Sequence, residues 1–177
     1  MRREELAQRG VQLPVLPTIA LGPLPPAPWP WEERLMAIGL DVLSTGRAED
    51  TPTGVAAARA SVPVRPLVAR GFDAPALAAA GAAIIEGTQT DDGPLYGLDW
   101  SDQVVRPVSA DGPVEATMEV ARAVLSAAQE GVPSALWVAA GPGLQDLPVE
   151  VVEDKLAALV EGARQARLYL AKEQFEL

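Results

Sequence analysis

Short, nearly continuous runs of apolar residues alternate along this chain with segments in which apolar residues recur every three or four positions. Continuous runs are typical of strands that are buried on both faces, and the wider spacing is typical of helices with one buried face. We therefore expect buried strands at residues 16–21, 40–44, 64–69, 82–86, 103–108 and 135–139.

Helices are expected between these strands. Asp73 can accept a hydrogen bond from the first turn of one helix, which has Pro75 at its start and Gly81 at its end. Asp111, followed by Gly-Pro, is expected to cap the helix that begins at residue 114. This helix is predicted to extend over residues 114–130, and further helices are predicted at residues 31–38, 55–60 and 148–172.

The alternation of strands and helices predicts an α/β fold whose parallel strands are joined by right-handed crossovers. Residues 1–30 form a proline-rich N-terminal segment that contains the first expected strand. Residues 31–177 are expected to form a single α/β domain, in which residues 87–102 are a polar loop.

Composition limits the chemistry of the chain. It has 177 residues and a net charge of −10, which disfavours binding to nucleic acid and to anionic membranes. It contains no cysteine and no histidine, so thiolate–zinc sites and a Ser-His-Asp triad are excluded. The charged start is unlike a secretory signal, and no apolar run reaches the length of a membrane span. We expect a cytoplasmic protein.

Four segments, in order, resemble the catalytic barrel of the cobalamin-independent methionine synthases. Residues 16–25 (Leu-Pro-Thr-Ile-Ala-Leu-Gly-Pro-Leu-Pro) resemble its opening strand, and residues 38–46 resemble its second strand. Residues 77–85 resemble a helix that leads into a later strand. Residues 136–144 (Leu-Trp-Val-Ala-Ala-Gly-Pro-Gly-Leu) and the helix after them resemble the last strand and helix. The resemblance implies parallel βα units that form a TIM-like barrel.

The departures from that family matter for function. Pro142 stands where the last zinc-binding cysteine of the family would fall, and the segment with the family's His-x-Cys pair is missing. The family's Asp-Glu-Pro motif falls near residues 88–90, which are Thr-Gln-Thr. A full barrel takes roughly 200–250 residues or more, so this chain resembles a shortened or partial barrel. We expect neither a metal nor a cofactor.

Candidate site residues follow from the rule that ligands bind at the carboxyl ends of parallel strands. Either Arg47 or Arg70 could bind a carboxylate with two hydrogen bonds, and Glu86 could act as a general base. Four aspartates in the loop at residues 87–102 lack the spacing of an EF-hand and are expected to be solvated. The candidate ligand-binding residues are Ser44, Arg47, Arg70, Glu86, Gln89 and Asp111.

Three functions remain open. The chain could be a degenerate methionine-synthase-like protein that binds a small molecule without zinc-dependent methyl transfer. It could be a non-catalytic interaction subunit, because missing barrel units would expose strand edges that pair with a second copy or a protein partner. It could also be an enzyme of unknown substrate that uses a carboxylate such as Glu86 or Asp111.

Overall fold

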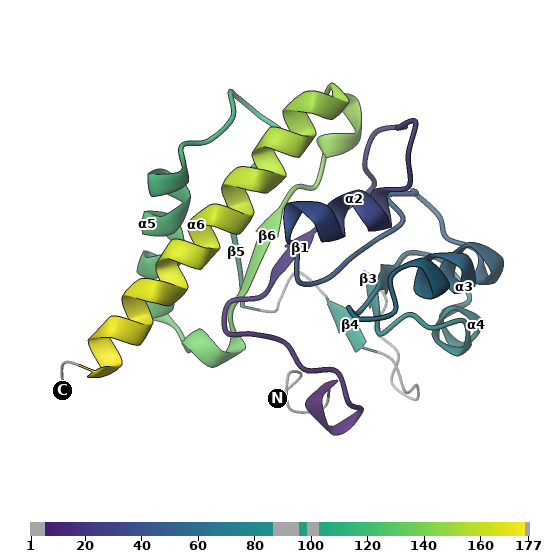
Figure 1. The fold of residues 1–177 in the computed structure, drawn as a ribbon, viewed down its shortest axis with the longest axis horizontal. Helices are drawn as coiled ribbons and strands as arrows, with labels where there is room; N and C mark the ends of the chain where they lie inside the picture. The colour runs from purple at the N-terminus through teal and green to yellow at the C-terminus, as the bar shows by residue number, and fades with distance from the viewer. Residues whose placement is uncertain (1–5, 87–95, 99–102, 176–177) are drawn as a thin grey trace.

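The computed structural model describes residues 6–86, 96–98 and 103–175 (Figure 1). Strands and helices alternate over only part of the described chain: two helices follow one another within residues 31–61, and three strands follow one another within residues 84–108. The strands are β1 (Thr18–Ala20), β2 (Val68–Ala69), β3 (Ile84–Glu86), β4 (Tyr96–Leu98), β5 (Val104–Val108) and β6 (Trp137–Ala140). The helices are α2 (Trp31–Ile38), α3 (Pro52–Ser61), α4 (Ala74–Ala79), α5 (Thr117–Glu130) and α6 (Val149–Phe175), with 3-10 turns at Pro133–Ala135 and Leu144–Asp146.

The strands form two small parallel sheets. One has the order β1-β6-β5 and the other β2-β3-β4, and every pairing is parallel. Residues 41–44 lie between the sheets: the Val42 N–H donates to the Thr18 carbonyl of β1 at 3.1 Å, and Leu43 forms a parallel bridge with Leu67 next to β2. Parallel strands are thus confirmed, and the described strands do not close into a barrel.

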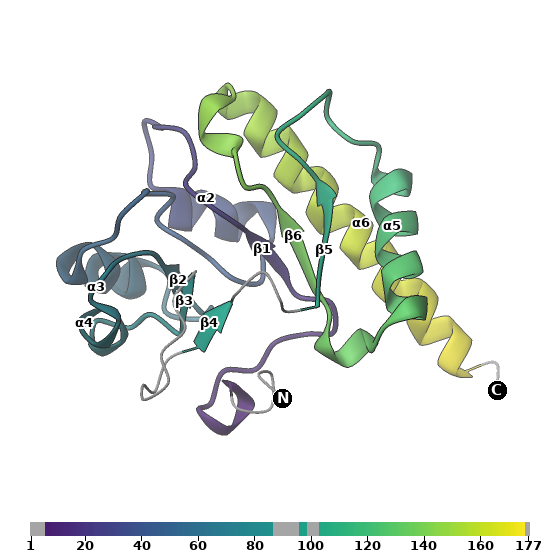
Figure 2. The ribbon, with the colours of Figure 1, turned by 180° about the vertical axis from the view of Figure 1, so that it is seen from behind.

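Helices cover the outer side of each sheet (Figures 1 and 2). Helices α5 and α6 lie side by side against the β1-β6-β5 sheet, whereas α3 and α4 lie beside the β2-β3-β4 sheet. Helix α2 packs against both α6 and α3. No helix in the described ranges is long and apolar enough to cross a membrane.

Helix α6 owes its position to one buried face. The buried residues of that face recur every three or four positions, which places them on one stripe of the helix. They are Val152, Lys155, Leu156, Leu159, Ala163 and Ala166. Gly162 lies on the side of α6 that meets α5, where an added Cβ would stand 2.4 Å from a methyl carbon of Val120. Glycine therefore allows the two helices to approach closely.

A second apolar cluster lies between the two sheets. It combines β1 and β6 residues such as Ile19 and Trp137 with Val42, with Val68 of β2 and with Ile84 of β3. Side chains alternate between the faces of a strand, so these residues mark the face that each strand turns inward. The inner faces of both sheets thus share one core.

Most of the predicted strands are shorter in the structure, and two of them are reduced the most. Residues 40–44 contribute only the bridge at Leu43, and the strand predicted at residues 64–69 is confined to Val68–Ala69. Proline has no N–H to donate to a ladder, and Pro66 uses only its carbonyl, which accepts from the Leu43 N–H at 2.9 Å. Apolar content predicted the buried position of these segments but overestimated their pairing.

Two further boundaries differ from the predictions. The helix expected from residue 114 begins at Thr117, and Ala116 rather than Asp111 occupies its N-cap position, without a side-chain cap. The segment expected to be a loop, residues 87–102, contains strand β4 at Tyr96–Leu98, and its other residues lie outside the described ranges. Gln103 precedes β5, which confirms the strand expected there.

Candidate functional site

Three polar residues continue the inward faces of the strands beyond the apolar core. Ser44, Arg70 and Glu86 each follow a core residue by two positions, after Val42, Val68 and Ile84 respectively. A spacing of two returns the side chain to the same face, so the three polar groups lie one layer further towards the carboxyl ends of the strands. We call them the strand-end cluster.

Arg70 and Glu86 form a buried ion pair at the end of β2 and β3. The Arg70 Nη1 atom lies 3.5 Å from the Glu86 Oε2 atom, and each side chain is only 10% exposed. Charged side chains this deeply buried need a partner, because their transfer out of water is costly. The pair therefore neutralises the end of the β2-β3-β4 sheet.

The same two residues hold the loop that follows β1. Arg70 Nη2 donates to the Gly22 carbonyl, and the Gly22 N–H donates to Glu86 Oε1 at 2.7 Å. Gly22 has a φ of +77°, and an added Cβ would lie 3.2 Å from the Pro142 Cβ. A glycine is thus required where the loops after β1 and β6 meet. The ion pair joins the ends of the two sheets through the backbone N–H and carbonyl of one residue.

Asp50 positions Arg70 from the loop before α3. Its backbone N–H donates to the Arg70 carbonyl at 2.6 Å, and its Oδ2 accepts from the Arg70 N–H at 2.8 Å. Thr45 donates its hydroxyl to Asp50 Oδ1. Asp50 is only 6% exposed. Sequence reasoning missed it, because a loop aspartate before Thr-Pro has no local signal that it will reach a strand end.

Several buried polar atoms of the strand-end cluster make no hydrogen bond to a described residue. Ser44 Oγ and Arg70 Nε have no such partner, and Arg70 Nη1 and Glu86 Oε2 meet only each other, in the 3.5 Å ion pair. More than nine in ten buried polar groups in proteins are hydrogen-bonded, so this cluster is unusual. The cluster can still donate through the guanidinium, accept through the carboxylate, and do either through the hydroxyl.

Burial changes the acidity of Glu86. Loss of solvation raises the pKa of its carboxyl above the usual value, and the negative charge of Asp50 adds to this rise. The Arg70 charge and the hydrogen bond from Gly22 oppose it without cancelling it. Glu86 therefore takes up a proton more readily than an exposed glutamate does.

The other predicted residues are not joined to this cluster. Arg47 is exposed and lines a separate pocket of about 890 Å³ with Trp29, Trp31 and Glu32. Burial raises the pKa of the Glu32 carboxyl above its usual value. Asp111 is exposed after β5, and its carbonyl accepts from the Ser109 hydroxyl at 3.2 Å. Gln89 lies outside the described residues.

Metal binding finds no support in the donor set. Zinc prefers cysteine and histidine, and the chain has neither. Within the described ranges, no group of three acidic side chains is arranged to hold an ion. The residues present therefore do not fit the zinc of the methionine synthase family.

Comparisons with known proteins complete this picture. No protein-family model matches the chain, and no curated protein matches it. Among solved structures, the chain is similar to a B12-independent methionine synthase from Shewanella sp. W3-18-1 in complex with selenomethionine, with 17% identity and a TM-score of 0.39. The similarity covers 77% of this chain and 51% of that chain, so it spans about half of the larger protein. A likeness at this level does not assign the chain to a family.

Proposed function

We propose that this chain binds a small polar molecule at the carboxyl ends of its parallel strands, without zinc-dependent methyl transfer. The supporting observation is the strand-end cluster, in which Ser44, Arg70 and Glu86 keep buried polar atoms that make no hydrogen bond to a described residue. Small-molecule sites place a few convergent polar groups against an apolar wall, and in parallel folds they lie at this end of the sheet. The inward-facing core beneath the cluster supplies such a wall.

We infer that the two sheets are two arcs of a shortened barrel. The bridge between Leu43 and Leu67 and the apolar core common to both sheets support this architecture. In this arrangement residues 31–177 form one α/β domain, to which the segment 1–30 contributes β1. The strand-end cluster then lies at the mouth of the barrel.

The free groups define the ligand's chemistry. Arg70 offers N–H donors and favours a carboxylate or carbonyl oxygen. The Glu86 carboxylate accepts, and it favours an ammonium or hydroxyl donor on the same ligand. A compact molecule with both groups, such as an amino acid or a hydroxy acid, satisfies the cluster best. The Arg70–Glu86 pair adds no net charge, so of these two classes a zwitterionic amino acid leaves the occupied cluster neutral.

A thermal-shift panel tests this proposal. The purified chain is heated with amino acids, hydroxy acids, simple carboxylates and simple amines, and Tm is followed against ligand concentration. A ligand at 100 times its Kd stabilises the folded state by about 2.7 kcal/mol. We expect at least one amino acid or hydroxy acid to raise Tm, with a smaller effect from acetate or methylammonium alone.

Variants connect the shift to the cluster. Glu86→Gln and Ser44→Ala should remove the ligand-dependent shift, whereas Glu119→Gln, an exposed carboxylate of α5, should retain it. If no compound in the panel raises Tm, or if Glu86→Gln responds like the unaltered chain, the strand-end cluster is not a ligand site.

A further inference from the structure

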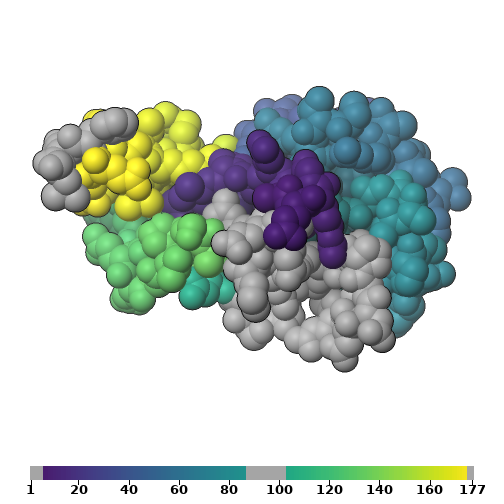
Figure 3. Space-filling view, turned by 90° about the horizontal axis from the view of Figure 1, so that it is seen from below, coloured from purple at the N-terminus to yellow at the C-terminus, as the bar shows by residue number. Residues whose placement is uncertain are grey.

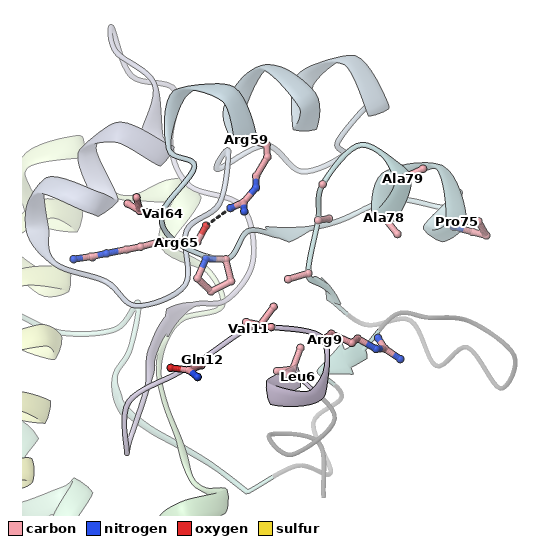
Figure 4. A pocket seen from close by; sticks show the side chains of 15 residues that line it. Leu6, Arg9, Val11, Gln12, Arg59, Val64, Arg65, Pro75, Ala78 and Ala79 are labelled. Atoms are coloured by element: carbon pink, nitrogen blue, oxygen red, sulfur yellow. Dashed lines mark hydrogen bonds between the residues drawn. The ribbon is translucent and has the colours of Figure 1, made fainter.

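A second pocket lies at the opposite ends of the strands from the cluster. It has a volume of about 560 Å³ and lies between the N-terminal segment, helices α3 and α4, and the approaches to β2 and β3 (Figure 4). Viewed from below, the N-terminal segment crosses this face beside the residues of α3 and α4 (Figure 3). The volume lies within the usual range of about 300–1,000 Å³ for small-molecule sites.

The charge of this pocket is opposite to that of the whole chain. Three arginines line it, at positions 9, 59 and 65, and no aspartate or glutamate of residues 6–86, 96–98 or 103–175 does. The chain as a whole carries a net charge of −10. Among the described residues, this hollow therefore concentrates positive charge, which favours an anion.

Arg59 is held in place over the pocket. Its Nη1 donates to the Arg65 carbonyl at 2.8 Å, as Figure 4 shows. Its aliphatic stem passes over Gly81, where an added Cβ would meet the Arg59 Cγ at 2.9 Å. A guanidinium has five N–H donors, so most of those of Arg59 stay available within the described part of the chain. Arg59 is thus an ordered cation with unused donors.

Arg9 and Arg65 have different roles. The Arg65 Nη1 donates a hydrogen bond to the Leu40 carbonyl, so this guanidinium is already engaged within the fold. Arg9 is exposed, and its guanidinium makes no hydrogen bond to a described residue. In Figure 4 the Arg59 side chain runs down from its helix towards the Arg65 carbonyl, whereas the Arg9 side chain extends outward at the edge of the view of the pocket. Arg59 is therefore the ordered cation of the pocket, and Arg9 adds an exposed positive charge at its rim.

Apart from Gln12, the remaining walls are largely apolar. They include Leu6, Val11 and Pro66, together with the alanines of α4 and of the turn before β3. Leu6 belongs to the core between the sheets, so the pocket continues the apolar interior outward. Apolar walls favour a hydrocarbon group, and arginine favours a negatively charged group. The pocket therefore fits one molecule that contains both parts.

We propose that this pocket is a binding site for a small anion with an apolar body, such as a carboxylic or phosphoric acid with an aliphatic or aromatic portion. Arg59 binds the anionic group, the exposed Arg9 adds positive charge at the rim, and the apolar walls take up the rest. This site is separate from the strand-end cluster and does not depend on its function.

A matched pair of fluorescent probes tests the proposal. 1-Anilinonaphthalene-8-sulfonate carries an anionic group on an aromatic body, and N-phenyl-1-naphthylamine has the same body without the charge. We expect the sulfonate to bind the full chain with one-to-one stoichiometry and at least tenfold more tightly than the neutral probe. Octanoate and octyl phosphate should both displace it, and the stronger competitor identifies the preferred anion. Inorganic phosphate, which has no apolar body, should not displace it.

Three variants locate the probe. Arg59→Gln and Arg9→Gln should weaken the sulfonate severalfold or more and leave the neutral probe unchanged. Ala79→Phe, at an exposed position of α4 that lines the pocket, should block both probes. Arg122→Gln, an exposed change of equal charge on α5, is the control and should alter neither Kd.

Two results would overturn the site. One is an unchanged sulfonate Kd in both Arg9→Gln and Ala79→Phe, which are exposed changes and do not depend on whether Arg59→Gln folds. The other is an equal loss of affinity for the two probes in Arg9→Gln. Glu86→Gln should leave sulfonate binding intact, so failure of the strand-end cluster as a ligand site can be told apart from failure here.

Discussion

Two buried ion pairs in this chain are built in opposite ways. Lys155 of α6 is fully buried, and its Nζ donates to the Pro113 carbonyl at 3.0 Å and to the two Glu115 oxygens at 3.0 and 3.2 Å. Its three donors are all used. The Arg70–Glu86 pair is also buried, yet it retains atoms that make no hydrogen bond to a described residue. The first pair uses its hydrogen-bonding groups within the fold, whereas the second leaves some of them for the ligand that we propose.

The largest expected effect comes from the Lys155–Glu115 pair. Lys155→Ala removes the ammonium that satisfies Glu115 and the Pro113 carbonyl, so we expect a loss of about 3 kcal/mol in the free energy of unfolding. Urea denaturation measures it. Lys172→Ala, on the exposed end of the same helix, should change stability by less than about 0.5 kcal/mol. Equal effects of the two changes would mean that the Lys155 contacts do not fix α6.

Buried hydroxyls allow the same comparison at a smaller scale. Thr18 Oγ1 donates to Asp41 Oδ2 at 2.9 Å and accepts from the Asp41 N–H at 3.1 Å, whereas the Ser44 Oγ has no partner among the described residues. Thr18→Val should cost about 1–2 kcal/mol of unfolding free energy, and Ser44→Ala about 0.5 kcal/mol or less. Should Ser44→Ala cost as much as Thr18→Val, the Ser44 hydroxyl is satisfied and the contrast fails.

The smallest effect is a change in pH dependence. Because burial raises the pKa of Glu86 in the folded state, the folded chain binds its proton more tightly than the unfolded chain does. Stability from this group is therefore greatest below the ordinary glutamate pKa and falls as pH rises towards the folded value. Glu86→Gln should gain stability relative to the unaltered chain as pH increases from about 4.5. Denaturation curves of both chains at increasing pH measure this difference in unfolding free energy. If the difference changed with pH in the opposite direction, the raised pKa of Glu86 would be contradicted.

The sequence predicted the positions of residues that follow buried strands. Arg70 and Glu86 were identified because each comes directly after or at the end of a short apolar run, and parallel strands bring such positions to one edge. The spacing of two from Val68 and Ile84 places them on one face, which requires no long-range information. The bounds of the helix at residues 31–38 and the cap at Asp73 were likewise local and correct.

Contacts made by loops were not predictable in this way. Asp50 reaches the Arg70 backbone across the fold, and no pattern in its neighbours indicates this contact. Glu115 was expected inside a helix, but its carboxylate bonds Lys155 and the Ser109 N–H, and the helix begins after it. In each case a tertiary contact determines where a side chain points and where an element begins.

Arg70 and Glu86 both hydrogen-bond the backbone of Gly22, and this arrangement has a consequence for tryptophan fluorescence. The loop that starts there continues to Trp31, whose indole N–H donates to the Pro25 carbonyl at 2.7 Å and whose ring meets that of Trp29 edge-on at 4.6 Å. A molecule that draws Glu86 or Arg70 away from Gly22 should also displace the first residues of this loop. We expect the intrinsic fluorescence of these indoles to change when the proposed ligand binds, so that binding could be followed without an attached dye.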